Sequence, residues 1–453
     1  MVKLDVLVIG AGTAGHYAAN AAKRNVEAVG VVERGPVGGD CIFHACIPTK
    51  ALIHAARTLK KMRSADFFGL LARGNGVNYE KVKAFKDRIV SGIAAGRDER
   101  LADTGIRLFK GEARFISPHE VTVGDETIRA DRIVITTGSL PAVPPIVGLK
   151  ETGYITNVEA LELERVPERL AIIGGGPIGV EFAQIFSAFG SRIHIYEALA
   201  RILGPEDEDI SQAMLRFFAK QGISVSTSTN VSQISSTASG KLVVSKTANG
   251  QEHREEYDEI LVATGRKPAI DDLNLPAAGV EATRRGISVD ASLRTSVPHI
   301  WAAGDVTGTF AFTLIAWQQG EVAGANATGD KQIEIDYRVL PRVTFCDPEV
   351  ASVGLTEKQA LEQGHRVKVG KYDYANLTRA IVSDETDGFI KIVAEGDSGR
   401  ILGGHIVGVE ASSLIHEVAL AMAKGLTVGD IGNTFHAYPT LSEGVRYACQ
   451  AII

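Results

Sequence analysis

Two cysteines carry the most reactive side chains in the sequence, and their spacing suggests that they act together. Cys41 and Cys46 lie five residues apart, just before a segment with a helical pattern in which Pro48 suits the first turn. Two cysteines at a helix start can come close enough to form a disulfide. A thiolate there is stabilised by the helix N-terminus and by a nearby cation, and Lys50 lies one turn beyond Cys46. The loop therefore predicts thiol–disulfide chemistry.

Two other interpretations of this loop fit less well. The cysteines could be unrelated buried thiols, but the flanking Gly38-Gly39 and the glycine motif that precedes them favour a functional loop. They could ligate zinc, but no second Cys or His pair has the spacing of a zinc site, so no metal cofactor is expected. Four cysteines are too few for a disulfide framework in a chain this long, and Cys346 and Cys449 are expected to be inert buried thiols.

A second set of functional residues occurs twice, as an apolar strand that runs into a GxGxxG motif. Each copy continues through a helix-forming segment into a second strand that ends in an acid, and the acid follows the first glycine by 23 residues in both copies. The two sets are Gly10, Gly12, Gly15 and Glu33, and then Gly174, Gly176, Gly179 and Glu197.

This arrangement has the physical features of a dinucleotide site. The first glycine makes a tight turn, the second lets the backbone approach a pyrophosphate, and the third lets the helix pack on the strand. The helix N-terminus attracts the phosphates, and the acid accepts hydrogen bonds from a ribose 2′-hydroxyl. Two copies predict two bound dinucleotides. Glu197 favours NAD over NADP in the second site, although Arg192 and Arg201 lie nearby.

The composition limits the class of protein. A chain of 453 residues suggests about three domains, and 45% hydrophobic with 23% charged residues is typical of a soluble globular protein. A net charge of −6 with scattered basic residues argues against nucleic-acid binding. No apolar run reaches the roughly 18 to 20 residues of a membrane span, and no export signal is visible at the N-terminus. We therefore expect a cytoplasmic protein without membrane or nucleic-acid partners.

The chain resembles the flavin-dependent pyridine nucleotide-disulfide oxidoreductases, the family of dihydrolipoyl dehydrogenase, glutathione reductase and mercuric reductase. The resemblance covers essentially the whole sequence. It rests on GAGTAG at 10–15, CIFHACIPTK at 41–50, GGGPIG at 174–179, ATGRKP at 263–268, AAGDV at 302–306 and YPTLSE at 438–443.

The resemblance implies an α/β fold with two Rossmann-like dinucleotide-binding domains and an α+β C-terminal dimerisation domain. The FAD-binding domain would comprise 1–145 and 266–333, with the NAD-binding domain, 146–265, inserted into it, and 334–453 would form the C-terminal domain. In the family this last domain makes a homodimer and delivers acid-base residues to the partner's disulfide.

The resemblance also implies the cofactors and their contacts. FAD would occupy the first glycine motif and NAD(H) the second. Asp305 would bind the ribityl or phosphate region of the flavin, Gly111 and Ala113 would lie near the adenine, and Gly265 near NAD. Gly138 and Gly265 are each the glycine of a Thr-Gly pair that ends a strand. Gly138 would close the first nucleotide-binding unit.

The family mechanism can be carried over to the cysteine loop. Electrons would pass from NADH through the flavin to a Cys41–Cys46 disulfide, with Cys46 facing the flavin and Cys41 attacking the substrate. Lys50 would lie near the flavin and pair with Glu181, on the helix after the second glycine motif.

One family signature is altered near the C-terminus. The family has His-Pro-Thr with a Glu five residues after the His, and the His is the acid-base catalyst. Here Glu443 is in register but Tyr438 takes the histidine position. A phenol with an ordinary pKa near 10 is a poor base at neutral pH. His436, or His44 in the cysteine loop, could replace it.

Three functions follow from these residues. The leading hypothesis is a dihydrolipoyl dehydrogenase-like enzyme that acts on a small-molecule or protein-bound disulfide such as a lipoyl group. A mercuric-reductase-like reductase of metals or electrophiles is the alternative, because Tyr438 and the segment 148–161 with Tyr154 resemble that enzyme, although this chain has no adjacent cysteine pair near its end. A flavoprotein module that senses NAD with little turnover is the third.

Overall fold

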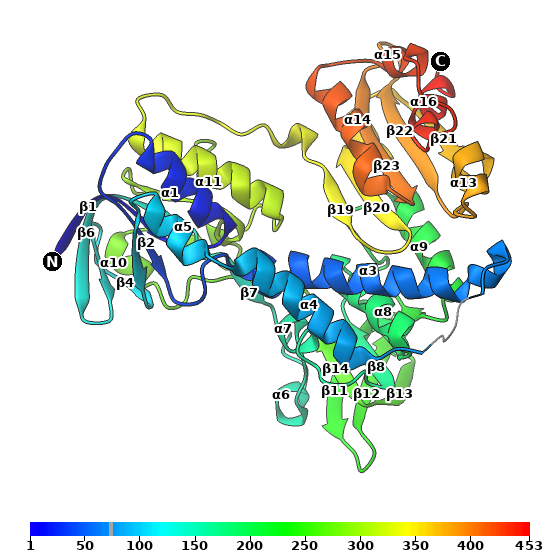
Figure 1. Ribbon diagram of the computed structural model, residues 1–453, viewed down its shortest axis with the longest axis horizontal. Coiled ribbons are helices and arrows are strands. Elements are labelled where there is room, and N and C mark those ends of the chain that lie inside the picture. Colours follow the sequence, from blue (N-terminus) through cyan, green and yellow to red (C-terminus); the bar gives the residue numbers. More distant parts are fainter. Residues whose placement is uncertain (72–75) are drawn as a thin grey trace. The chain divides into compact units, whose positions relative to one another are not determined.

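The computed structural model describes residues 1–71 and 76–453 (Figure 1). The chain forms two units, and each unit draws on three stretches of the sequence. Unit 1 comprises Met1–Ala51, Lys83–Val143 and Gly265–Ile335, and unit 2 comprises Leu52–Val82, Pro144–Thr264 and Asp336–Ile453.

The sheet of unit 1 is built around β1 (Val2–Ile9), an apolar strand whose second half is buried. β1 pairs in parallel with β2 (Val29–Glu33) on one side and with β6 (Glu126–Ile135) on the other. β18 (Ile300–Ala302) then pairs in parallel with β6, although a second parallel sheet is formed between them in the sequence. The remaining strands of this sheet are β3 (Arg107–Lys110), β4 (Ala113–Ser117) and β5 (Glu120–Val123).

Two helices of unit 1 pack with their backbones in contact. In Figure 1 α1 (Thr13–Lys23) and α11 (Thr313–Thr328) lie side by side. A Cβ added to Gly320 or Gly324 would overlap backbone oxygens of α1, so close helix packing requires glycine at both positions. The other elements of this unit include α2 (Asp40–Phe43), α5 (Arg97–Asp103), β7 (Ser139–Pro141), α10 (Leu275–Ala278), β15 (Arg266–Pro268), β16 (Ala282–Thr283) and β17 (Gly286–Ile287), while α3 (Cys46–Arg63) and α4 (Tyr79–Ala94) have residues in both units.

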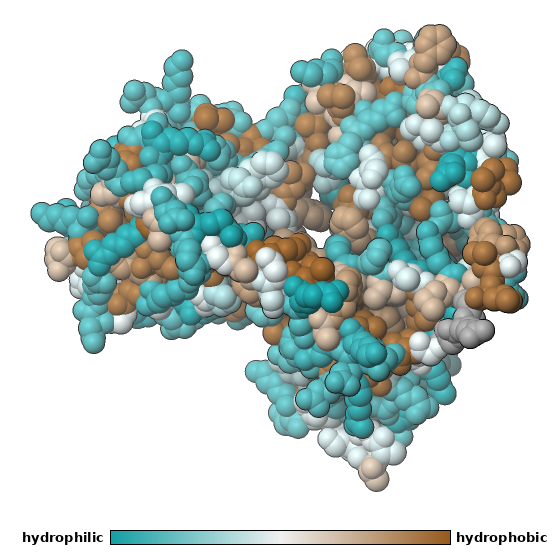
Figure 2. Space-filling view, in the orientation of Figure 1, coloured by the Kyte–Doolittle hydropathy of each residue, from teal (hydrophilic) through white to brown (hydrophobic). Residues whose placement is uncertain are grey.

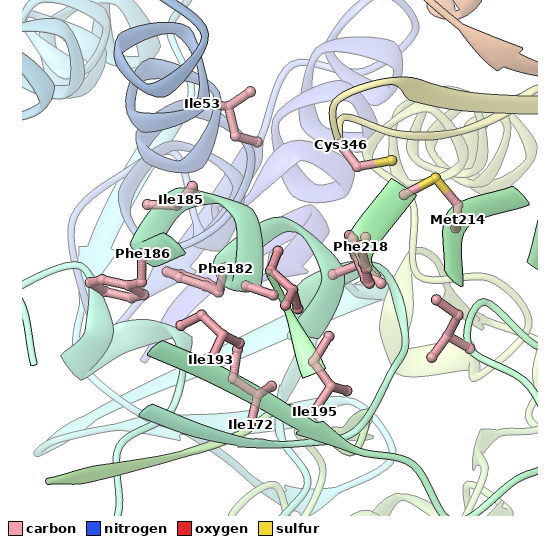
Figure 3. Packing of buried hydrophobic residues seen from close by; sticks show 14 of the residues in the cluster. Ile53, Ile172, Phe182, Ile185, Phe186, Ile193, Ile195, Met214, Phe218 and Cys346 are labelled. Carbon is pink, nitrogen blue, oxygen red and sulfur yellow. The ribbon is translucent and has the colours of Figure 1, made fainter. Parts of the chain in front are cut away.

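The first sheet of unit 2 repeats the parallel arrangement around β8 (Arg169–Ile173). Its strand order is β10-β9-β8-β14, and α8 (Pro177–Phe189) follows β8. Figure 3 shows Ile172, Phe182 and Ile195 in the core beside this sheet, with Cys346 among apolar side chains. The other elements are α6 (Leu149–Thr152), α7 (Asn157–Ala160), β9 (Arg192–Tyr196), α9 (Glu208–Lys220), β10 (Ser224–Ser226), β11 (Thr229–Ser236), β12 (Lys241–Thr247), β13 (Glu252–Tyr257) and β14 (Glu259–Val262).

The C-terminal part of unit 2 is an antiparallel sheet with helices packed on it. The sheet has the order β19-β20-β23-β22-β21, and every residue of β23 (Ile401–Gly408) is buried. α14 (Ala411–Ala423) and α16 (Glu443–Gln450) contribute apolar side chains to its core, which also holds Cys449. The other elements are β19 (Arg342–Thr344), β20 (Glu349–Gly354), α12 (Glu357–Glu362), β21 (Val367–Asp373), α13 (Thr378–Val382), β22 (Phe389–Glu395) and α15 (Val428–Asn433).

A buried lysine joins the antiparallel C-terminal sheet of unit 2 to the starts of α9 and α12. The side chain of Lys391 in β22 is 4% exposed, and its Nζ lies 2.9 Å from Asp207 and 2.7 Å from Glu357. Burial opposes the charge, but the hydrogen bonds to Glu357 and Asp207 outweigh it and raise the pKa of Lys391. The cation is therefore retained, and removing one carboxylate would leave it under-compensated in a dry environment.

The α/β fold class is confirmed. Two strand–glycine–helix–strand units form sheets whose central strands are parallel, the second within the sequence of the first, and an antiparallel α+β domain follows. The residue boundaries given above for the three domains stay predictions. None of the helices in residues 1–71 and 76–453 combines the length and the apolar character that crossing a bilayer requires.

Candidate active site

Two consecutive short elements bring the cysteine pair together. α2 is a single turn that carries Cys41, and α3 begins at Cys46 with Pro48 in its first turn. Both cysteines are thiols, both are partly exposed, and their side chains hydrogen-bond to each other. This hydrogen bond, with burial, raises the pKa of the Cys41 thiol. The pair is thus close enough for thiol–disulfide exchange.

Two polar groups favour loss of a proton from this pair. Thr313, the first residue of α11, places its Oγ1 3.1 Å from Sγ of Cys46 and also hydrogen-bonds Cys41. The ammonium of Lys50 acts through space to lower the pKa of Cys41, against the larger effects of Cys46 and burial. Thr313 belongs to no motif in the sequence, and only the fold brings it to the cysteines. Its hydroxyl can donate to a thiolate.

Lys50 and Glu181, the predicted ion pair, each have a partner within their own unit. Nζ of Lys50 donates to Oγ1 of Thr49 at 3.3 Å. Glu181 in α8 is buried, and its Oε1 accepts the backbone N–H of Phe345 at 3.0 Å. An ion pair between Lys50 and Glu181 would involve one residue from each unit, and it stays a prediction.

Asp40, the residue before Cys41, is held from two sides. Its Oδ2 accepts from a guanidinium nitrogen of Arg266 at 2.6 Å, and its Oδ1 lies 3.2 Å from Nδ1 of His44. Burial alone would raise the pKa of Asp40, but the hydrogen bond from His44 and the charge of Arg266 hold it below its ordinary value. Arg266 also donates to Oγ and to the carbonyl of Ser139 at 2.7 and 2.8 Å. An ionised carboxylate is therefore fixed beside the cysteine loop.

Asp305, predicted to contact the flavin, lies in the same cluster. Its Oδ2 accepts from the Ser139 hydroxyl at 2.6 Å and lies 3.8 Å from Nε of Arg266. Burial raises the pKa of Asp305, because desolvation outweighs the hydrogen bond from Ser139 and the charge of Arg266. Asp40 and Asp305 thus share one cation, which no sequence motif could have revealed.

The first glycine motif forms a cradle at the end of β1. Gly10 has φ of 106°, in the left-handed region, and a Cβ on Gly15 would overlap the carbonyl oxygen of Gly10. A Cβ on Gly12 would meet nothing closer than 3.7 Å, so space for a ligand remains in front of it. Glu33 accepts the N–H of Ala11 at 2.7 Å. These residues fit the phosphates and ribose of FAD.

The second glycine motif repeats this geometry at the end of β8. Gly174 has φ of 112°, and a Cβ on Gly179 would overlap its carbonyl oxygen. A Cβ on Gly176 would have no described atom within 4 Å. Glu197 accepts the N–H of Gly175 at 2.7 Å, which matches the bond made by the acid of the first cradle. This cradle fits a second dinucleotide.

The two acids have the same structural role. Glu33 and Glu197 each accept a second backbone N–H, from Gly35 and Leu199 respectively, at 2.7 Å. Arg201, the cation that could have favoured a 2′-phosphate, donates to two backbone carbonyls of its own loop. Glu197 is therefore held by two backbone N–H groups, and the nucleotide preference stays a prediction.

The other predicted cofactor residues lie at backbone turns of unit 1. Gly138 and Gly265 have φ of 72° and 118°, and the short strands that follow them, β7 and β15, pair antiparallel. Gly111 has φ of 143° and donates its N–H to the carbonyl of Glu33 at 3.0 Å, while Ala113 begins β4. Gly111 is thus placed beside the end of β2, next to the first cradle.

In the C-terminal signature, the hydrogen-bond partners given for Tyr438 and Glu443 are residues other than each other. Tyr438 is 72% exposed, and its hydroxyl lies 3.5 Å from Oγ1 of Thr378. Glu443 is buried at the start of α16 and accepts from the hydroxyl of Tyr447 at 2.9 Å and from the N–H of Thr440 at 3.1 Å. The bond to Glu443 raises the pKa of Tyr447. The carboxylate is therefore engaged by Tyr447 and Thr440.

His436, two residues before Tyr438, is held between two acceptors. Its side chain is 6% exposed, Nε2 lies 2.9 Å from Oε1 of Glu417, and Nδ1 lies 3.0 Å from the carbonyl oxygen of Thr434. Both ring nitrogens thus face oxygen atoms within the C-terminal part of the chain. The geometry favours a structural role for His436.

The comparisons with known proteins show which family the chain belongs to. Residues 4–320 match the family model described as pyridine nucleotide-disulphide oxidoreductase, and residues 340–449 match the dimerisation domain of the same family. The chain belongs to the pyridine nucleotide-disulphide oxidoreductase family. It is an FAD-dependent flavoprotein disulfide reductase with a dimerisation domain, and the family uses FAD and NAD(P)H. The resemblance and the cofactors stated from the sequence are confirmed.

Individual relatives carry different enzyme names. A mercuric reductase of Lysinibacillus sphaericus is 38% identical over 98% of this chain and 82% of the relative. A dihydrolipoyl dehydrogenase of Chlamydia trachomatis is 39% identical over 97% of this chain and 94% of the relative. The copper(II) complex of the HOCl-induced flavoprotein disulfide reductase RclA from Escherichia coli has a TM-score of 0.89 at 30% identity, over 99% of both chains. Similarity alone leaves the substrate open.

Replacing Thr313 by Val removes a hydroxyl from the cysteine pair and keeps the side-chain shape. A hydrogen bond to a charged group contributes about 1.5–3 kcal/mol, so the pKa of the Cys46 thiol should rise by roughly one to two units. The pH dependence of iodoacetamide alkylation of Cys46 in reduced protein measures this shift. Thr58→Val, at an exposed position of α3, is the control. An unchanged alkylation profile for Thr313→Val would show that the hydroxyl does not stabilise the thiolate.

Proposed function

We propose that the protein transfers electrons between NAD(H) and a disulfide or dithiol substrate, as a dihydrolipoyl dehydrogenase-like enzyme that acts on lipoyl groups. The observation that carries this proposal is the hydrogen-bonded Cys41–Cys46 pair in a chain with two dinucleotide cradles. Bound FAD supplies two-electron exchange between a nicotinamide and a sulfur pair. The residues of the chain hold the nucleotides, orient the sulfurs and manage the protons.

The two cysteines have different surroundings, and this supports different roles. Cys46 is the first residue of the long helix α3 and contacts the Thr313 hydroxyl, so a thiolate is best stabilised there. Cys41 lies on a single turn, and its raised pKa means that it keeps its proton until a base removes it. In our proposal Cys46 is the sulfur next to the flavin, with Lys50 beside it, and Cys41 attacks the substrate.

The nucleotide preference follows from the second cradle. A carboxylate at Glu197 accepts hydrogen bonds from the 2′-hydroxyl of the NAD ribose and repels the 2′-phosphate of NADP. The engagement of Arg201 by backbone carbonyls supports this assignment. NADH is therefore the proposed nucleotide.

We propose a homodimer, in which the C-terminal segment serves the cysteine pair of the partner. The dimerisation-domain match supports it, and so does the 97% exposure of Phe435 beside the exposed Tyr438. Exposed apolar side chains also lie at the end of α3 and in the segment after it, a feature typical of interaction surfaces, and Figure 2 shows hydrophobic surface there. These side chains are Met62, Phe67, Phe68, Leu70 and Leu71.

A second candidate substrate is a soft metal ion. The observation that favours it is Tyr438, which takes the place of the histidine that a disulfide reductase uses, with the half-buried Tyr154 as a further likeness to mercuric reductase. Anaerobic assays separate the two candidates. NADH oxidation with lipoamide but not with mercuric or copper(II) ions supports the disulfide substrate, and the reverse result supports the metal ion.

Replacing Cys46 by Ser should abolish NADH-dependent reduction of lipoamide, by about a thousandfold or more, because the sulfur pair is the only route to the substrate in this proposal. The protein should still purify with FAD. Cys449→Ala is the control, because burial raises the pKa of Cys449 to about 12 and leaves that thiol inert. Lipoamide reduction that survives Cys46→Ser, with flavin bound, would contradict the proposed electron route.

Replacing Glu197 by Gln tests the nucleotide preference. The change removes the charge that repels a 2′-phosphate and weakens the bonds to a 2′-hydroxyl, which are worth about 1.5–3 kcal/mol when charged. The ratio of kcat/KM for NADH to that for NADPH should fall by roughly tenfold or more. Glu208→Gln, at an exposed position in α9, should leave the ratio unchanged. An unaltered ratio in Glu197→Gln would mean that another residue selects the nucleotide.

A further inference from the structure

A row of polar residues crosses the antiparallel C-terminal sheet of unit 2 from edge to edge. The register pairs each member of the row with the next, through neighbouring strands in the order β19, β20, β23, β22 and β21. The flanking residues of β22 and β23 are buried and are apolar or glycine, so the polar character is confined to the row. The row consists of Arg342, Ser352, His405, Lys391 and Lys371.

The two faces of this sheet pack against different parts of unit 2. Ile390 and Ile406 belong to the core to which α14 and α16 contribute. Phe389 and Val407 belong instead to the core that surrounds β8 and includes side chains of α9. Because successive side chains of a strand point to opposite faces of its sheet, the row shares the face of Phe389 and Val407. The row therefore lies on the side of the sheet that faces α9.

Two consecutive acids before α9 are the partners of the row. Nζ of Lys391 donates to Oδ1 of Asp207 at 2.9 Å. Nε of Arg342 donates to Oε1 of Glu206 at 3.2 Å, and the Ser352 hydroxyl donates to Oε2 of the same carboxylate. The side chains of Glu206 and Asp207 are only 10% and 4% exposed. Two buried carboxylates are thus bound by two different cations of the sheet.

His405 lies between these cations in the row. Its side chain is buried, Nε2 lies 2.9 Å from the carbonyl oxygen of Leu355, and Nδ1 has no hydrogen-bond partner in the described part of the chain. Burial lowers the pKa of His405, although the charges of Asp207 and Glu206 oppose this effect. The neutral ring is therefore favoured, and the two cations that bind the acids are separated by an uncharged residue.

The two acids end a loop that starts at the acid of the second cradle. Glu197 accepts the N–H of Gly175 at 2.7 Å, and Leu203 donates its own N–H to the carbonyl of Gly175 at 2.9 Å. Ile202 lies so close that a Cβ on Gly175 would be 2.6 Å from its Cγ2. Gly175, within the glycine motif, is therefore held through both its N–H and its carbonyl by the segment 197–203.

The conformation of this loop must be maintained by its surroundings. Leu203 has φ of 49°, in the left-handed region that a leucine rarely adopts. Glu206 donates its backbone N–H to the carbonyl of Leu203 at 2.8 Å, which closes the turn. If Glu206 is released from the sheet, Leu203 loses this support, and its hydrogen bond to Gly175 is weakened with it.

We propose that the polar row holds the second cradle in the geometry that binds a nucleotide. Arg342 and Lys391 fix the two acids before α9, and the loop 198–206 is thereby held against Gly175. The members of the row are positioning residues, because they act on the nucleotide through this loop. Residues 340–449 match a dimerisation domain, so that domain gains a second role, in nucleotide affinity. The inference rests on the proposed binding of NAD(H) in the second cradle and adds residues to that site.

The test measures binding of NAD⁺ to the oxidised, full-length holoenzyme by isothermal titration calorimetry. Arg342→Gln removes the cation from Glu206 and should raise the Kd for NAD⁺ by about fivefold or more. In stopped-flow reduction by NADH, the concentration that gives the half-maximal rate should rise by a similar factor. The limiting rate should stay within about twofold of wild type, because the row does not contact the reacting atoms. The FAD content should not change.

Milder variants keep the test valid if Arg342→Gln folds poorly. Ser352→Ala removes only the hydroxyl that donates to Glu206, and it should raise the Kd for NAD⁺ by about two- to threefold. Glu206→Gln and Arg342→Gln should not be additive, because the double variant leaves no uncompensated buried charge. Additive losses of affinity would mean that the two residues act independently, which would contradict the proposal.

Val418→Ala is the matched control for loss of stability. Val418 lies in α14 and packs beside Gly404 on the opposite face of the same sheet, so the change loosens the C-terminal core without altering the row. It should lower the melting temperature and leave the Kd for NAD⁺ unchanged. If it weakens NAD⁺ binding as much as Arg342→Gln does, for the same loss of melting temperature, the row acts only through stability and the proposal is overturned.

One more variant distinguishes failure of this proposal from failure of the proposed function. Gly176→Val fills the open space of the second cradle and should abolish NAD⁺ binding. Abolished binding in Gly176→Val, with a wild-type Kd in Arg342→Gln and Ser352→Ala, would overturn the role of the row and keep the nucleotide site. Wild-type binding in Gly176→Val would overturn the proposed nucleotide site itself.

Discussion

The approach of two sulfur atoms is the constraint on which the rest of the site depends. Cys41 and Cys46 come from successive short elements, and their hydrogen bond raises the pKa of Cys41. A pair this close can form or break a disulfide with little change of backbone. Thr313 and Lys50 favour a thiolate at the pair. The surrounding structure thus addresses one need of exchange, a stabilised thiolate.

The two nucleotide sites have the same local backbone structure and the same acid contact. In each unit a glycine with positive φ turns the chain, another glycine leaves open space, and an acid binds the N–H that follows the first glycine at 2.7 Å. The acid therefore has a structural role before any nucleotide binds. This explains why the spacing from glycine to acid is so closely repeated, since the acid must reach its own loop as well as a ribose. The second strand–glycine–helix–strand segment lies within the sequence of the first nucleotide-binding fold, and both cradles are nevertheless formed.

The features predicted from the sequence were those that local spacing determines. The strand–glycine–helix units, their acids and the cysteine loop follow from periodicity and from short motifs, and the resemblance supplied the order of the domains. The contacts of Thr313 with Cys46 and of Arg266 with Asp40 could not be found in this way, because each joins residues that lie far apart in the sequence. The partners of His436 likewise follow from packing. Substrate choice depends on groups that the motifs do not include, which is why relatives with two enzyme names fit equally well.

The central claim is that electrons from NADH reach the Cys41–Cys46 pair. An anaerobic titration of the oxidised holoenzyme with NADH, with thiols counted by alkylation and mapped by mass spectrometry, tests it most directly. We predict that the first equivalent produces two new thiols, at Cys41 and Cys46, while most of the oxidised flavin absorbance persists. Loss of that absorbance after one equivalent, with no new thiol at either cysteine, would contradict the account.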